Sequence, residues 1–135
     1  MKLLCDIPSG TELLVHICCA PDASYGVRAL RDRFDVAGFF YNPNIHPREE
    51  FRKRLFAALD LQEKDPFPLL IGTGGEEGWE DAVRGMEGEP EGGRRCEACV
   101  RLRLRETARK AVELGMPAFG TVLTVSPKKD AAMVN

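Results

Sequence analysis

Two short apolar runs, separated by an amphipathic segment, constrain the fold of this chain more than any other feature of its sequence. Residues 12–17 and 36–41 are nearly continuous apolar stretches, which is typical of strands buried on both faces of a parallel sheet. Residues 22–34 between them repeat apolar positions at helical spacing. A strand, a helix and a second strand in this order predict a right-handed crossover between parallel strands.

The rest of the chain continues this alternation. We expect helices over residues 48–59, 79–86 and 96–114, strands over 67–71 and 118–123, and a last helix that begins at Ser126-Pro127. The helix over 48–59 is predicted to bury Phe56 together with Phe51, Leu55 and Leu59.

This order predicts an α/β fold with a mainly parallel sheet, in a single domain over residues 1–135. Residues 1–11 would form an N-terminal extension, and residues 72–93 a flexible loop rich in Gly and Glu. Because the chain stops a few residues into the last predicted helix, we expect its C-terminus to be truncated.

Composition limits the class of protein. Of the 135 residues, 44% are hydrophobic and 30% are charged, as in a globular protein. No apolar run reaches about 18 residues, the length that a membrane span needs, and the N-terminus is too soon interrupted to be a signal peptide. We therefore expect a cytoplasmic protein with no membrane partner, whose five cysteines serve as metal ligands or redox groups rather than disulfides.

Charge is distributed unevenly, although the net charge is only −2. Residues 72–93 contain seven acidic residues and one Arg, whereas residues 94–110 contain seven basic residues and two Glu. Two interpretations of the basic segment stay open, a solvated helix face or a track for nucleic-acid phosphates. The candidate RNA-binding residues are Arg94, Arg95, Arg101 and Arg105, with Lys128 at the start of the last predicted helix.

Four cysteines lie where predicted strands and helices meet. Cys18 and Cys19 follow the first strand directly, and Cys96 and Cys99 lie at the start of the long helix. Thiolates bind both zinc and iron–sulfur clusters, and a third interpretation makes these cysteines small buried side chains. Because neighbouring side chains on an extended loop diverge, we expect Cys18 and Cys19 to serve two metals side by side.

Asp22 has two interpretations. It is either a hard oxygen ligand for iron or zinc, or the N-cap of the helix over 22–34. Cys5 stands apart from the other cysteines and is interpreted as an ordinary residue.

The loop after the second strand, residues 42–47, offers further candidates. The C-terminal ends of parallel strands meet at one edge of the sheet, so we expect this loop and the Cys18-Cys19 pair to share one crevice. Tyr41 and His46 could donate a proton there or stack on a base, although a lone loop histidine is more often a surface residue. His16 lies inside the first strand and is interpreted as a hydrogen-bonded core histidine.

Four motifs in order identify a family. They occupy residues 14–21 (Leu-Val-His-Ile-Cys-Cys-Ala-Pro), 40–47 (Phe-Tyr-Asn-Pro-Asn-Ile-His-Pro), 95–102 (Arg-Cys-x-x-Cys-x-Arg-Leu) and 124–128 (Thr-Val-Ser-Pro-Lys). With these motifs the chain resembles the QueH-type epoxyqueuosine reductases over residues 13–129. The resemblance implies a Rossmann-like, three-layer fold and an oxidoreductase of queuosine biosynthesis. Without cobalamin, it would reduce the epoxide of epoxyqueuosine at the tRNA wobble position to an alkene.

The resemblance also implies cofactors and partners. Cys18, Cys19, Cys96 and Cys99 would be metal-binding thiols that hold a [4Fe-4S] cluster, and Asp22 would bind a neighbouring iron or zinc ion. The substrate would be tRNA carrying epoxyqueuosine, and the electrons would come from an external donor.

The implied catalytic residues are Asp22, Tyr41 and His46, of which the last two could supply the proton for the departing oxygen. Many relatives have a third Cys where this chain has Asp22, which makes Asp22 the candidate for the neighbouring metal. Relatives usually have Tyr where this chain has Val100 and Lys128. The family's C-terminal segment, with its own cysteines, is absent from this sequence.

Two other functions stay open from the residues alone. An ATP-pyrophosphatase-like tRNA thiolation enzyme needs a Gly-rich phosphate loop after the first strand, and residues 18–22 contain no Gly. The other function is that of a zinc-bound, non-catalytic RNA-binding module. A visible absorbance spectrum separates this module from an iron–sulfur protein, because a zinc protein is colourless.

Overall fold

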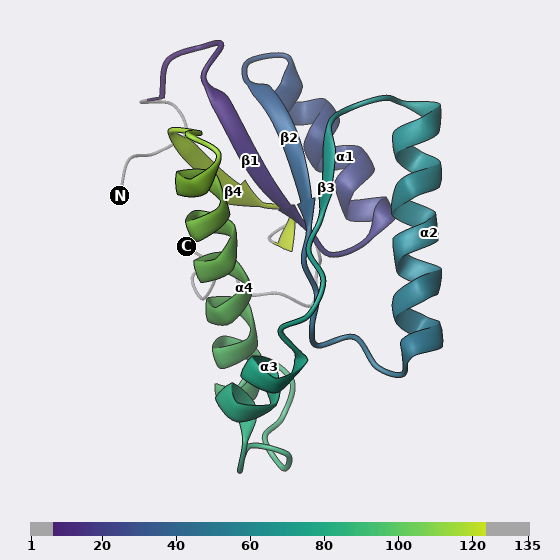
Figure 1. Cartoon of the computed structure of the whole chain (residues 1–135), viewed down its shortest axis with the longest axis vertical. Helices are drawn as coiled ribbons and strands as arrows, with labels where there is room; N and C mark the ends of the chain where they lie inside the picture. Colours follow the sequence, from purple (N-terminus) through teal and green to yellow (C-terminus); the bar gives the residue numbers. More distant parts are fainter. Residues whose placement is uncertain (1–6, 124–135) are drawn as a thin grey trace.

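The computed structural model describes residues 7–123, which form a four-stranded sheet covered by helices (Figure 1). The strands are β1 (Glu12–Ile17), β2 (Asp35–Phe40), β3 (Leu69–Ile71) and β4 (Ala118–Thr121). The helices are α1 (Ala20–Arg31), α2 (Arg48–Lys64), α3 (Glu76–Val83) and α4 (Arg94–Glu113). All the strand pairs are parallel, in the order β3-β2-β1-β4, so the predicted α/β class is confirmed.

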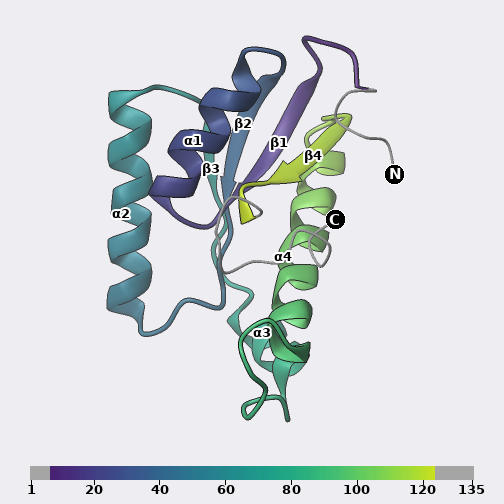
Figure 2. The same cartoon turned by 180° about the vertical axis from the view of Figure 1, so that it is seen from behind.

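The sheet is the middle of three layers. Helices α1 and α2 lie on one face and α4 lies on the other, as the two opposite views show (Figure 1, Figure 2). Alternate residues of β1 serve the two layers: Leu13, Val15 and Ile17 pack in the cluster with α1 and α2, whereas Leu14 packs with Ala111 of α4. Burial from both sides explains why the run over 12–17 is almost continuously apolar.

The direction of the chain across the sheet reverses at β1. The chain passes from β1 to β2 and β3 on one side, and then returns through α4 to β4 on the other side. Consequently Ile17 lies opposite Phe40 of β2, while His16 lies opposite Thr121 of β4. In such sheets a crevice opens beyond the C-terminal ends of the strands at the point of reversal. Cys18 leaves β1 at this point.

The start of α1 differs from the prediction. The helix begins at Ala20, because Pro21 fits the first turn, where its missing N–H costs no hydrogen bond. The N-cap is Cys19, whose side chain makes no capping hydrogen bond, so the interpretation of Asp22 as the N-cap is wrong. Asp22 lies in the first turn instead.

Helices α2 and α3 also differ from their predictions. Helix α2 continues to Lys64, and Phe56 is 64% exposed, so its predicted burial is wrong. Phe56 lies about 100° around the helix from Leu55, which turns it away from the stripe that contains the buried Ala58. The short helix predicted over 79–86 is α3, which begins three residues earlier at Glu76.

Some predictions concern residues outside the described range. Cys5, Lys128 and the last helix from Ser126 all lie outside residues 7–123. The predicted N-terminal extension is described only from Ile7 onward. Among the helices of the described range, none is long and apolar enough to cross a membrane.

His16 is fully buried near the end of β1, and both of its ring nitrogens are hydrogen-bonded, as predicted for a core histidine. Nε2 donates to the Tyr41 carbonyl oxygen at 2.9 Å, and Nδ1 accepts from the Thr121 hydroxyl at 3.1 Å. Burial, followed by the positive charge of Arg103, lowers the pKa of His16 to about 3. The ring is therefore neutral, and it links β1 to the ends of β2 and β4.

Gly38 of β2 should be intolerant of a side chain. A Cβ atom at this position would lie 2.5 Å from Ile17 Cδ1 and 2.9 Å from Phe67 Cε2. We expect Gly38→Ala to lower the free energy of unfolding by about 1–3 kcal/mol, because overpacking displaces core side chains. Denaturant unfolding measures the loss. Gly78→Ala in α3, where a Cβ meets no atom within 4 Å, should leave stability unchanged or raise it.

His16 should make stability depend on pH. Its pKa is about 3 when folded, against an ordinary value of 6.5, so the unfolded chain binds the proton more readily and stability falls as pH drops below about 6.5. Between pH 7 and pH 5 this group should remove about 2 kcal/mol from the free energy of unfolding. Denaturant unfolding at both pH values tests this. His16→Gln should lose about 2 kcal/mol less over the same interval, and an equal loss would contradict the assignment.

Candidate metal centre and neighbouring cleft

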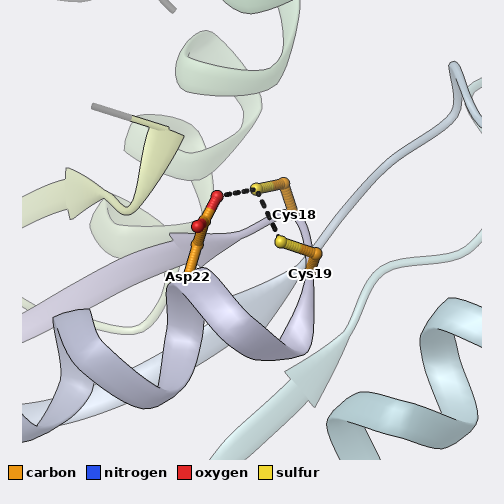
Figure 3. A group of neighbouring side chains, drawn as sticks. All are labelled: Cys18, Cys19 and Asp22. Atoms are coloured by element: carbon orange, nitrogen blue, oxygen red, sulfur yellow. Dashed lines mark hydrogen bonds between the residues drawn. The ribbon is translucent and has the colours of Figure 1, made fainter. Parts of the chain in front are cut away.

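Cys18, Cys19 and Asp22 form a group that could hold a metal ion, since one ligand atom from each lies within 4.8 Å of the others. Cys18 Sγ lies 3.9 Å from Cys19 Sγ and 3.7 Å from Asp22 Oδ2 (Figure 3). The predicted divergence of the two thiols is wrong. Because α1 begins at Ala20, its first turn carries Asp22 back toward both sulfur atoms.

The two thiols are protonated unequally. The hydrogen bond from Cys18 lowers the pKa of Cys19 to about 7, although partial burial opposes this shift. The same hydrogen bond, and then burial, raise the pKa of Cys18 far above its ordinary value. In the metal-free chain Cys19 is therefore the more readily ionised of the two thiols, and Cys18 is its hydrogen-bond donor. A bound metal ion would replace the Cys18 proton, because sulfur ligates metals as the thiolate.

The second thiol pair lies in the first two turns of α4. Cys96 Sγ accepts a hydrogen bond from the Gly92 N–H at 3.3 Å, and Cys99 is buried against Trp79 and Val83 of α3. Within residues 7–123, neither thiol belongs to a group of three ligands as close as that of Cys18. The two pairs are nevertheless neighbours, because Cys18 packs in one cluster with Val100, the residue after Cys99.

A cleft of about 340 Å³ opens beside the second thiol pair. Its walls include Asn44 from the loop after β2, Trp79 of α3, and Cys96, Cys99 and Arg103 of α4. Cys18 and Cys19 are not among its lining residues, so this cleft places the loop after β2 beside the second thiol pair and not, as predicted, beside the first. The first thiol pair is connected to the loop after β2 through a backbone group. Asn42 Nδ2 donates a hydrogen bond, 2.9 Å long, to the carbonyl oxygen of Ile17, the residue before Cys18.

The Trp79 ring contacts both another aromatic ring and a cation beside this cleft. The His46 ring lies 5.1 Å from the Trp79 ring, tilted by 48°, and the Arg95 guanidinium lies 5.6 Å from the Trp79 ring centroid. Trp79 Nε1 and Asn44 Oδ1 are buried without a hydrogen-bond partner among the described residues. A polar ligand that entered with a modest side-chain adjustment could satisfy both atoms.

Tyr41 lies apart from the stack. Its ring stacks on Phe39 at 5.6 Å and packs with Leu14 and Ala111 between the sheet and α4. Burial raises the pKa of the Tyr41 hydroxyl, and the negative charges of Glu106 and Glu76 raise it further. Tyr41 therefore keeps its proton more firmly than an exposed tyrosine.

The candidate RNA-binding arginines on α4 are mostly exposed. Arg101 and Arg105 face solvent, and Arg101 pairs with Glu97 at 2.8 Å. Arg94 pairs with Glu89 at 3.6 Å, and Arg95 is half-buried against Trp79. Lys128 lies outside the described residues.

Sequence reasoning missed Arg103. The structure buries Arg103 and Thr107 on α4 together with Cys99, Val100 and Ala111. Arg103 follows Cys99 by four residues, one turn along the helix, so its position beside a buried thiol was the available signal. Trp79 and Asn44 carried no such signal, because α3 and the loop after β2 meet only in the folded chain.

Comparison with known proteins agrees with the motifs. The sequence model of the family "Epoxyqueuosine reductase QueH" matches residues 13–135. The protein of that name from Streptococcus pyogenes serotype M1 is 36% identical over 130 residues, which cover 92% of this chain and 51% of the relative. The one from Histophilus somni (strain 129Pt) is 36% identical over 132 residues, covering 96% and 54%.

The Helicobacter pylori (strain ATCC 700392 / 26695) protein of the same name is 41% identical over 121 residues, which cover 87% of this chain and 33% of the relative. The chain thus spans about half the length of most of the curated relatives it matches. The match covers all four motifs and every thiol from Cys18 to Cys99. The resemblance seen in the sequence is confirmed, and the chain belongs to the epoxyqueuosine reductase QueH family.

Proposed function

We propose that this chain is part of an epoxyqueuosine reductase that acts on tRNA. The reaction would convert the epoxide of epoxyqueuosine at the wobble position to the alkene of queuosine. Two electrons and two protons enter, both carbon–oxygen bonds break, and the oxygen leaves as water. The observation that carries the proposal is the group of Cys18, Cys19 and Asp22 at the reversal point of the sheet, in a chain of this family.

The residues fit the proposed metals. Two thiols and a carboxylate within 4.8 Å suit a single iron or zinc ion that keeps open positions for substrate. A [4Fe-4S] cluster is larger than one ion, so its thiolates could come from both pairs, Cys18 or Cys19 and Cys96 with Cys99. When bound, the cluster would pass on single electrons from an external donor, and the ion would act as a Lewis acid on the epoxide oxygen.

Side chains of the cleft would hold the modified base. Trp79 and His46 offer rings for stacking, and the unpaired Trp79 Nε1 and Asn44 Oδ1 offer one donor and one acceptor. Of the two predicted proton donors, His46 is the better placed, because its ring contacts Trp79 of the cleft wall. Tyr41 is packed between the sheet and α4.

The exposed face of α4 would hold the tRNA phosphates. Arg94, Arg95 and Arg105 lie on or near this face, and the ion pair of Arg101 with Glu97 is exposed. Exposed pairs contribute little, so Arg101 can exchange its carboxylate partner for a phosphate. Such contacts bind by charge and position the tRNA, while the cleft selects the base.

Cys19→Ala should abolish iron binding and turnover together, because Cys18 would remain as the one thiol of this group and could not serve both the ion and the cluster. Anaerobic iron and sulfide quantification, a visible spectrum and an assay on tRNA carrying epoxyqueuosine measure both. Asp22→Ala should abolish turnover while most cluster iron is retained. Cys5→Ala, the control, should change neither. A colourless protein that holds one zinc ion and binds tRNA without turnover would instead support a zinc-bound RNA-binding module.

The proton arrangement of the thiols is testable in the metal-free chain. Alkylation of Cys19 by iodoacetamide should rise with pH through a midpoint near its pKa of about 7, since only the thiolate reacts. Cys18→Ala removes the hydrogen-bond donor and should move the midpoint upward, toward about 8.5. Mass spectrometry of the alkylated peptide identifies the residue. A midpoint that Cys18→Ala leaves unchanged would refute the shared proton.

A further inference from the structure

In the part of the chain that the structure describes, Arg103 is a buried cation without a buried anion beside it. It is 4% exposed, in the middle of α4 on the face toward the sheet. Its Nε donates to the Cys99 carbonyl oxygen at 3.5 Å, and its Nη1 donates to Asn42 Oδ1 at 3.3 Å. Both acceptors are neutral, and both distances are at the long end of the hydrogen-bond range. Within residues 7–123, Arg103 forms no ion pair, whereas Arg101 and Arg109 on the same helix each pair with a Glu.

The buried guanidinium of Arg103 destabilises the fold unless a negative charge lies next to it. A buried charge without a counter-ion strongly destabilises a fold. His16, the nearby titratable group in the sheet, can supply no negative charge, and both of its ring nitrogens are hydrogen-bonded. Glu89 and Glu91 line the same cleft as Arg103, but within residues 7–123 neither pairs with it, and Glu89 pairs with Arg94 at 3.6 Å. The other groups of the cleft wall that can become anionic are the thiols of Cys96 and Cys99.

Arg103 lies between the two thiol pairs. It lines the cleft with Cys96 and Cys99, and it contacts the Cys99 carbonyl directly. On its other side it holds Asn42, whose Nδ2 donates to the carbonyl of Ile17, the residue before Cys18.

We propose that Arg103 is the built-in counter-charge of the thiolate centre: its guanidinium offsets the negative charge that the thiolates of both pairs acquire when they bind metal. This deepens the proposed function and rests on it for the identity of the metal group. Arg103 is then a positioning residue, which acts through the thiols rather than on the substrate. It strengthens metal binding, and it makes the bound group easier to reduce, because a nearby positive charge favours the more negative form.

The test is metal binding by the metal-free full chain, with Co²⁺ as the probe and its thiolate charge-transfer absorbance as the signal. Arg103→Gln removes the charge but keeps a polar side chain, and Co²⁺ affinity should fall about 10- to 100-fold. Arg103→Lys keeps the charge and should recover most of the affinity. Arg109→Gln, an exposed position on the same helix, should bind Co²⁺ as the unchanged chain does.

Arg103→Met separates a charge role from a packing role. Without metal, this variant should be at least as resistant to denaturant as the unchanged chain, since an apolar side chain replaces an unpaired buried charge. Its Co²⁺ affinity should nevertheless fall as in Arg103→Gln. If Arg103 only tethered α4 to the loop after β2, Arg103→Met would be less stable and Arg103→Lys as defective as Arg103→Gln. Either result would overturn the proposal.

The reduction potential gives a second readout in the iron-loaded chain. Arg103→Gln should move the potential to more negative values, and Arg103→Lys should restore it; an unchanged potential in Arg103→Gln would overturn the proposal. The two levels of inference fail separately. A chain that reduces epoxyqueuosine while Arg103→Gln binds Co²⁺ normally retains the proposed function and loses the counter-charge. If Arg103→Gln weakens Co²⁺ binding but the unchanged chain does not reduce epoxyqueuosine, the counter-charge is retained and the proposed function is lost.

Discussion

The central position of β1 determines where the chemistry of this chain can take place. β1 pairs with β2 on one side and β4 on the other, so it is buried on both faces and along both edges. The residues that follow it must leave at the point where the two crossovers separate. Cys18 and Cys19 occupy that exit, and the early start of α1 turns Asp22 back beside them. The ligand group thus follows from sheet order and one helix start.

The surroundings of the thiols are as specific as the thiols themselves. Polar groups beneath them form one continuous set: Arg103 contacts Asn42, Asn42 contacts the end of β1, and His16 joins β1 to Tyr41 and Thr121. Within this set His16 is neutral and Arg103 is positively charged. The positive charge lies beside Cys99, whose thiol could offset it as a thiolate. Protein dipoles and charges around a metal centre orient its ligands and tune its affinity.

The sequence was sufficient for the layers but not for the contacts between them. The bounds of β1 match the prediction, because alternation and burial on two faces leave a strong local pattern. The N-cap interpretation of Asp22, the burial of Phe56 and the divergence of Cys18 from Cys19 were wrong, since each depends on a helix start or rotation that shifts by one or two residues. Arg103 was missed for a different reason. Its burial depends on the space between α4 and the sheet, which no local pattern reports.

The short distance between the Cys18 and Cys19 sulfur atoms also affects how the metal-free chain would be oxidised. A half-exposed thiol with a depressed pKa, next to a second thiol at 3.9 Å, is the arrangement that oxidants attack first. The sulfenic acid formed on Cys19 would have a second thiol within reach to condense with. Metal occupancy removes both sulfurs from this reaction. The metal-free chain is therefore the form in which these two thiols would oxidise to a disulfide.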